Sequence, residues 1–183
     1  MSSFDKILVL MGPAFRTREF SAALGKSAGY ARLVLHRLKK RGELENLKRG
    51  WWAQPNALPE EVAAIISYPC YVSFQSALYG HGLTTQLPLK VQIVVSRKAR
   101  KYAVFSTRVQ EYRVPKQAFN GYDVRKGLPL ATPEKAFADC LRLPRSCPAI
   151  ILVEALPKLG EEKIRGYCSK RMLERLEKVR KQC

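Results

Sequence analysis

The sequence predicts an α+β protein made of two domains, residues 1–54 and residues 55–183. Three observations indicate this class. The first domain reads as capped helices followed by a short hairpin. Between residues 87 and 130, apolar and polar side chains alternate as they do in β-strands. From residue 131 onward, apolar residues recur at helical spacing, so the second domain is predicted to hold a mostly antiparallel sheet flanked by helices.

A short helix, a tight turn and a longer helix form the most informative part of the chain. The short helix covers residues 16–24, with Arg16 or Thr17 as its N-cap. It ends at Gly25, where a positive φ costs least. Ser27 then caps the longer helix, which continues to the next glycine. One side of this helix is apolar at the spacing i, i+3, i+4 and i+7, through Ala31, Val34, Leu35 and Leu38.

The other side of the longer helix is basic and polar, and it carries Tyr30, Arg32, His36, Lys39 and Lys40. A helix that enters the major groove needs such a face, because phosphates and base-edge acceptors line the groove. Two short strands follow, at residues 44–46 and 51–53, and Lys48 and Arg49 lie in the turn between them. A basic turn of this kind is typical of a wing, so residues 1–54 are predicted to form a winged helix-turn-helix that binds double-stranded DNA.

The predicted DNA contacts divide into two groups. Base edges and phosphates of the major groove would be read by Ser27, Tyr30, Arg32 and His36. The phosphate backbone and the minor groove would be contacted by Lys26, Lys39, Lys40, Lys48 and Arg49. The competing interpretation is an amphipathic helix with a solvated basic face. The order of capped helix, glycine turn, basic helix and basic wing favours the DNA reader.

The net charge of +18 is large for 183 residues and is spread along the whole chain. Spread positive charge predicts binding to polyanions by more than one surface, with a strong dependence on salt. A dense basic segment is the loop at residues 96–101. Its cations are predicted to form a second basic surface, for flanking DNA or for an acidic partner: Arg97, Lys98, Arg100 and Lys101.

Neither a metal nor a cofactor is expected. None of the five cysteines forms a C-x-x-C pair, and only two histidines are present, which argues against a zinc site. The apolar run at residues 7–11 is too short to span a membrane. The odd number of cysteines and the lack of a signal peptide predict a cytoplasmic location.

An enzyme is the first alternative. A metal-dependent nuclease would need clustered carboxylates, and the candidates are Glu111, Asp123, Glu134 and Asp139. Glu134 and Asp139 are about 140° apart around a helix axis, so they do not converge. Helix capping and surface charge explain them better, and His81 reads as a structural residue at a helix end. No catalytic residue is therefore predicted.

General nucleic-acid binding, to RNA or as an architectural DNA protein, is the second alternative. The basic β region contains three aromatic residues that would stack on bases, Tyr102, Phe105 and Tyr112. Strand alternation turns at least some of these rings inward, which favours a role in the core.

Four stretches, taken in order, resemble the AbiEi family of antitoxins and transcriptional regulators of type IV toxin–antitoxin systems. They are the winged helix ending in Gly50-Trp51-Trp52, YVSFQSALYGHGLT at residues 71–84, the basic β region, and ATPEKAFADCLRL at residues 131–143. The resemblance covers about residues 4–160. It implies an autorepressor whose N-terminal domain binds inverted repeats in its own promoter. It also implies a C-terminal domain that neutralises a nucleotidyltransferase-type toxin without forming a tight complex.

Overall fold

The computed structural model describes residues 3–182, with side chains from Lys6 onward, and shows a mixed α+β protein. The chain divides into two compact units, residues 1–66 and residues 67–183. The division lies in the last turn of α4 (Pro59–Ser67), later than the boundary at residues 54 and 55 expected from the sequence. Most of that helix therefore belongs with the first unit.

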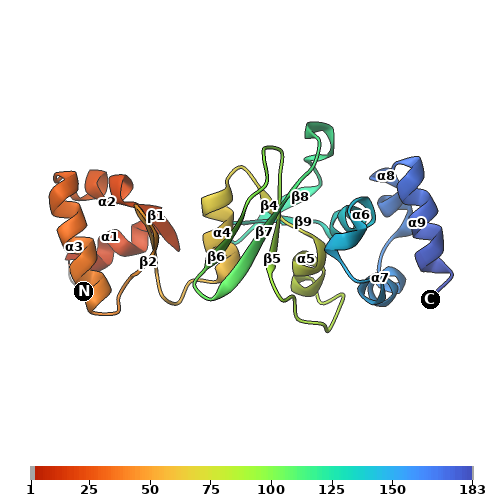
Figure 1. Cartoon of the computed structure of the whole chain (residues 1–183), viewed down its shortest axis with the longest axis horizontal. Helices are drawn as coiled ribbons and strands as arrows, with labels where there is room; N and C mark the ends of the chain where they lie inside the picture. Colours follow the sequence, from red (N-terminus) through yellow and green to blue (C-terminus); the bar gives the residue numbers. More distant parts are fainter. Residues whose placement is uncertain (1–2, 183) are drawn as a thin grey trace. The chain divides into compact units, whose positions relative to one another are not determined.

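The first unit combines helices with a small antiparallel sheet (Figure 1). Its helices before α4 are α1 (Ser3–Met11), α2 (Thr17–Leu24) and α3 (Ala28–Lys40). Its strands are β1 (Ala14–Arg16), β2 (Glu45–Lys48) and β3 (Trp51–Ala53), in the order β1-β3-β2. Strand β1 was not expected, because three residues between two helices are too few to show an alternating pattern.

The core of the first unit forms where α2, α3 and β3 meet. The predicted apolar side of α3 is buried, and Phe15, Phe20 and Trp52 pack with it. Ser27 caps α3 as predicted, since its Oγ accepts the backbone N–H of Tyr30 at 3.3 Å. Gly25 ends α2 at a φ of 60°. These local signals were sufficient to place both helices.

The N-cap of α2 is Arg16, one of the two residues between which the sequence did not decide. The backbone N–H of Arg16 donates to the carboxylate of Glu19 at 2.7 Å. The hydroxyl of Thr17 instead accepts the indole N–H of Trp52 at 2.9 Å. This long-range partner explains why Thr17 is not the cap.

The second unit contains a six-stranded sheet in the order β6-β7-β5-β4-β9-β8. Its strands are β4 (Tyr71–Val72), β5 (Val91–Val95), β6 (Lys101–Val104), β7 (Thr107–Arg113), β8 (Tyr122–Arg125) and β9 (Leu128–Ala131). The sheet is mixed rather than mostly antiparallel, because β4 pairs in parallel with β9 and β5 pairs in parallel with β7. The parallel pairs involve strands that are distant in sequence, which spacing alone does not reveal.

Strand β5 corrects a second expectation. The sequence suggested a strand with one polar face, yet all of β5 is buried, Gln92 included. The strand lies inside the sheet between β4 and β7. The side-chain amide of Gln92 donates to the carbonyl of Ser146 at 2.6 Å, which allows a polar residue to sit there.

Helices of the second unit pack together over part of this sheet (Figure 1). They are α5 (Phe74–Gly80), α6 (Pro133–Arg142), α7 (Ala149–Ala155), α8 (Glu161–Gly166) and α9 (Lys170–Arg180). Short 3-10 turns occur at Lys116–Ala118, Pro144–Ser146 and Leu156–Lys158. The region from residue 131 onward, where apolar residues recur at helical spacing, is therefore divided among α6, α7, α8 and α9. Helix α6 is central, because it contacts α5, α7, α8 and α9.

A buried ion pair lies at the centre of this helical layer. Lys135 and Asp139, one turn apart on α6, are almost fully inaccessible to solvent. The second oxygen of Asp139 accepts the hydroxyls of Tyr71 at 3.0 Å and Ser73 at 2.9 Å. Ser73 is the residue before α5, but its hydroxyl donates to Asp139 and does not cap the helix. Asp139 is therefore an internal group and not the surface charge that the sequence suggested.

Candidate nucleic-acid interface

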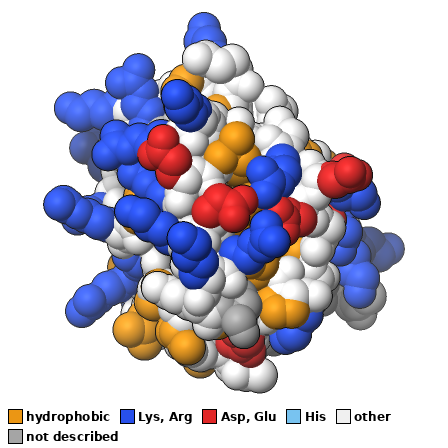
Figure 2. All heavy atoms as spheres, turned by 90° about the vertical axis from the view of Figure 1, so that its right-hand side faces the viewer, with side chains coloured by type: hydrophobic (Ala, Val, Ile, Leu, Met, Phe, Trp, Pro, Cys, Tyr) orange, Lys and Arg blue, Asp and Glu red, His pale blue; other side chains and the backbone are white. Residues whose placement is uncertain are grey.

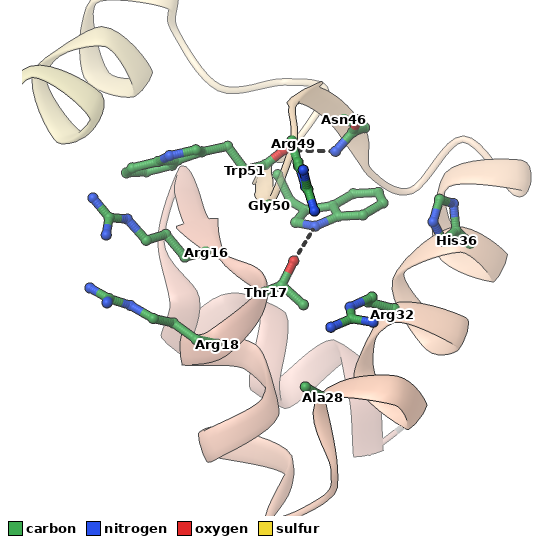
Figure 3. Close-up of a pocket in the computed structure, with 11 residues that line it drawn as sticks. Arg16, Thr17, Arg18, Ala28, Arg32, His36, Asn46, Arg49, Gly50 and Trp51 are labelled. Atoms are coloured by element: carbon green, nitrogen blue, oxygen red, sulfur yellow. Dashed lines mark hydrogen bonds between the residues drawn. The ribbon is translucent and has the colours of Figure 1, made fainter.

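A concave surface lies on the first unit between α3, the start of α2 and the β2–β3 turn (Figure 3). It encloses about 780 Å³. Its lining residues are Arg16, Thr17, Arg18, Ala28, Arg32, His36, Asn46, Arg49, Gly50, Trp51 and Trp52. Four arginines and a histidine are present among them, and no lining residue is acidic. The surface therefore favours an anion.

Backbone and side-chain hydrogen bonds fix the shape of this surface. The backbone N–H of Thr17 donates to the carbonyl of Gly50 at 3.0 Å, which ties the start of α2 to the β2–β3 turn. The side-chain amide of Asn46 donates to the carbonyls of Lys48 and Trp51 at 3.2 and 3.0 Å. These hydrogen bonds from Asn46 span the β2–β3 turn, so the backbone that carries Lys48 and Arg49 has a defined position.

One face of α3 forms a wall of the concave surface. Ala28, Arg32 and His36 are four residues apart and so lie along one side of the helix. The His36 ring meets the indole of Trp52 edge-on, with ring centroids 5.4 Å apart. Trp52 in turn donates to Thr17. This chain of contacts links α3, β3 and α2.

The structure brings three of the nine predicted DNA-contact residues together: Arg32, His36 and Arg49 line the concave surface. Lys48 lies close by, with its ammonium 5.6 Å from the centroid of the Trp51 ring. Ser27 is occupied as the cap of α3. Four predicted residues are exposed but lie outside the lining: Lys26, Tyr30, Lys39 and Lys40.

Of the eight lining residues that the sequence did not predict as DNA contacts, three supply a cation or a partly exposed ring: Arg16, Arg18 and Trp51. The two arginines flank the first residue of α2, and basic residues at that position were the available signal. Trp51 was assigned only to a strand. Leu33, which the sequence did not single out, is 48% exposed on α3.

The loop predicted to form a second basic surface is partly engaged inside the protein. The guanidinium groups of Arg97 and Arg100 lie 2.8 and 3.1 Å from the carboxylate of Glu111. The side chain of Glu111 is fully buried, and Ser67 also donates to it at 2.8 Å. Two of the four predicted cations thus compensate an internal charge. Lys98 and Lys101 remain exposed.

The hydrogen bonds to Glu111 determine its pKa. Burial alone would raise the pKa of this carboxyl, because it disfavours the charged form. Hydrogen bonds from Arg97, Arg100 and Ser67 outweigh burial and lower the pKa from 4.5 to about 2. Glu111 is therefore ionised at neutral pH, and its ion pairs with Arg97 and Arg100 hold the loop at residues 96–101 in place.

His81, which was weighed as a catalytic base, has two partners within the second unit. His81 contacts the carbonyl of Ala131 at 2.8 Å through Nε2 and Arg125 at 3.4 Å through Nδ1, which links the end of α5 to β9. Within residues 3–182, no three His, Cys, Asp or Glu side chains are grouped as they would be around a metal. Over the same residues, no helix has the length and apolar character needed to cross a membrane.

Most of the net positive charge belongs to the second unit. Residues 67–183 hold 22 Lys and Arg against nine Asp and Glu. Figure 2 looks onto the C-terminal end of the chain and shows Lys and Arg side chains over much of this face, with Asp and Glu side chains near its centre. Several of these charges are paired on the surface, as when Arg165 contacts both Glu161 and Glu177. The face is basic but shows no concentrated site.

Comparison with known proteins supports the fold alone. No known family profile matches the chain, and no curated protein matches it either. The structure is similar to the crystal structure of the RV2827C protein from Mycobacterium tuberculosis, with a TM-score of 0.66. The two are 15% identical in sequence, and the match covers 96% of this chain and 73% of that chain. What this chain shares with that protein is therefore its architecture.

Proposed function

We propose that residues 1–66 form a winged helix-turn-helix that binds double-stranded DNA and that the protein is a sequence-specific transcriptional regulator. In this proposal α3 enters the major groove, where Arg32 and His36 reach base edges or phosphates. The β2–β3 turn acts as the wing, and Lys48 and Arg49 contact the backbone or the minor groove.

The concave surface is the observation that supports this proposal best. Its lining includes cations from α2, α3 and the hairpin turn, and none of its lining residues is acidic. The cations lie on elements that hydrogen bonds hold together, so little conformational freedom would be lost on binding. If the basic face of α3 were only solvated, cations from the other two elements would not need to line the same surface.

The resemblance to AbiEi proteins adds the biological role that we propose. The chain would repress its own promoter at inverted repeats, and its second unit would neutralise a nucleotidyltransferase-type toxin without a tight complex. The experiment for this part is co-expression of the chain with the product of a neighbouring gene. Rescue of growth would support the antitoxin role, whereas unchanged toxicity would leave only the DNA-binding role.

The DNA-binding proposal is tested by titrating the chain against its own upstream DNA and a scrambled duplex at two salt concentrations. We expect a preference of about a thousandfold for the upstream DNA. Equal, strongly salt-dependent binding to both duplexes would contradict a sequence-specific regulator. That result would favour general nucleic-acid binding through the spread positive charge.

Replacing Arg32 by alanine is expected to reduce affinity for the upstream DNA by about tenfold to a hundredfold and to relax sequence preference, because a base contact is lost. Arg37→Ala is the matched control. It removes the same charge from the same helix at a position about 140° away around the axis. A larger loss for Arg37→Ala would show that a different face of α3 meets the DNA.

Removing the two cations of the hairpin turn, Lys48→Ala together with Arg49→Ala, is expected to act differently. Binding should weaken by a similar factor for the upstream and scrambled duplexes, because phosphates carry no sequence information. The slope of log affinity against log salt should fall by about two, since two phosphate contacts are lost. An unchanged slope would exclude the turn from the interface.

A further inference from the structure

We propose that Arg16, Arg18, Trp51 and Lys48 form a second contact, separate from α3, for the sugar–phosphate backbone of duplex DNA that flanks the site. We call these four residues the sheet-face cluster. The inference rests on the proposed DNA binding and extends it, because it names the part of the DNA that this cluster takes. Trp51 positions the cations of the cluster, and the cations contact the DNA backbone.

The pairing of the three strands places Arg16, Trp51 and Lys48 of the cluster in one row. Trp51 lies on the central strand β3, opposite Arg16 on β1 and opposite Lys48 on β2. The guanidinium carbon of Arg16 is 4.7 Å from the centroid of the Trp51 ring, and the Lys48 ammonium is 5.6 Å from it. A single indole therefore holds a cation from each neighbouring strand by cation–π attraction.

Alternation along β3 separates the two tryptophans. Trp52 is 3% exposed and packs into the core, whereas Trp51 is only partly buried. Figure 3 shows Trp51, Arg16 and Arg18 stacked on one side of the concave surface, with Arg32 and His36 across from them on α3. Arg18 is exposed in the first turn of α2 and adds a third cation on this side.

The arrangement suits phosphates better than bases. Two cations already lie over the ring of Trp51, so the indole is less available to stack on a base. The cations come from three elements, β1, β2 and α2, and a group of cations suits the repeated negative charges of a phosphate backbone. An aromatic ring that holds long side chains in place reduces the rotamer freedom they lose on binding. Trp51 thus raises affinity without itself contacting the DNA.

A backbone contact beside α3 predicts that affinity depends on DNA outside the site read by α3. The site is first defined by footprinting the wild-type chain on its upstream DNA. Binding is then measured on a duplex that ends at this site and on one extended by about one helical turn, about 10 base pairs, on each side. The wild-type chain is expected to bind the extended duplex about tenfold more tightly.

Replacing Trp51 by alanine is expected to remove most of this tenfold gain, so that the variant binds the extended duplex little more tightly than the short one. Trp51→Phe keeps an aromatic ring and is expected to retain most of the gain. The salt slope on the extended duplex should be unchanged in Trp51→Ala, because the cations remain. It should fall by about one in Arg16→Ala and in Arg18→Ala.

The outcomes separate this inference from the proposal beneath it. If the wild-type chain prefers its upstream DNA but Trp51→Ala, Arg16→Ala and Arg18→Ala bind both duplexes as it does, the sheet-face cluster is not a DNA contact and the winged-helix proposal stands. If the wild-type chain has no preference for its upstream DNA, both fail. Arg18 is exposed and its variant is expected to fold, so the test remains decisive if Trp51→Ala does not.

Discussion

Replacing Asp139 by alanine is expected to destabilise the second unit by about 3–5 kcal/mol, the largest effect we predict. The change leaves the ammonium of Lys135 buried beside α6 with its carboxylate partner removed. It also takes away the acceptor of the Tyr71 and Ser73 hydroxyls. A buried charge without its partner costs far more than the net stabilisation from an intact pair, because its lost hydration is no longer offset.

Urea unfolding followed by circular dichroism measures this effect. The matched control is Glu161→Ala, which removes an exposed carboxylate paired with Arg165 one turn away, and it is expected to cost less than about 1 kcal/mol. Adding Lys135→Met to Asp139→Ala should recover part of the loss, because it removes the uncompensated charge. A loss below about 1 kcal/mol for Asp139→Ala would mean that the pair is not buried and charged.

Replacing Glu111 by glutamine is expected to destabilise the second unit by about 3 kcal/mol at neutral pH. The carboxylate is the common acceptor for Arg97, Arg100 and Ser67, and a neutral amide cannot hold two guanidinium groups equally well. This loss of stability should lie at the low end of the range for breaking a buried ion pair, because Arg97 and Arg100 are both partly exposed to water.

The contribution of Glu111 should also depend on pH in a defined window. Its pKa is about 2 in the folded protein and 4.5 ordinarily, so the unfolded chain takes up a proton first as the pH falls. The stabilisation is therefore fully present above pH 4.5 and is lost as the pH falls toward 2. The difference in unfolding free energy between wild type and Glu111→Gln should shrink over the same window.

Urea unfolding at a series of pH values, on both proteins, checks this expectation. Glu43→Gln is the control, because Glu43 lies in an exposed pair with Arg41 at 2.8 Å and should alter stability little at any pH. A difference between wild type and Glu111→Gln that stays constant from pH 5 to pH 2 would contradict the assignment. It would mean that the folded and unfolded pKa values of Glu111 are equal.

The helices of the first unit could be predicted because their signals are local. Ser27, the glycine at position 25 and the apolar side of α3 are all set within a few residues of one another. The strand β1 and the link from Thr17 to Trp52 could not, since they join residues far apart in sequence. The same limit applies to the concave surface, where Arg32, His36 and Arg49 were predicted and Arg16, Arg18 and Trp51 were missed.

Charge in the second unit was the harder matter to predict. Arg97 and Arg100 read as a solvated basic loop, and Asp139 read as surface charge. Each is an internal or bridging group whose partner comes from another element, as Glu111 and Tyr71 show. A sequence indicates which residues carry charge, but burial and pairing depend on the tertiary fold. At the basic surface expected at this loop, Lys98, Arg100 and Lys101 are exposed, and Arg97 and Arg100 also pair with Glu111.

The position of β4 in the sheet has a consequence for how the chain acquires its structure. This two-residue strand pairs with β5 on one side and with β9 on the other, and the second pairing joins Val72 to Leu130. Contacts between residues so distant in sequence form slowly, because a long loop must close first. The sheet of the first unit needs only residues 14–53. During synthesis, the unit that we propose binds DNA is thus expected to be ordered before the centre of the second sheet can form.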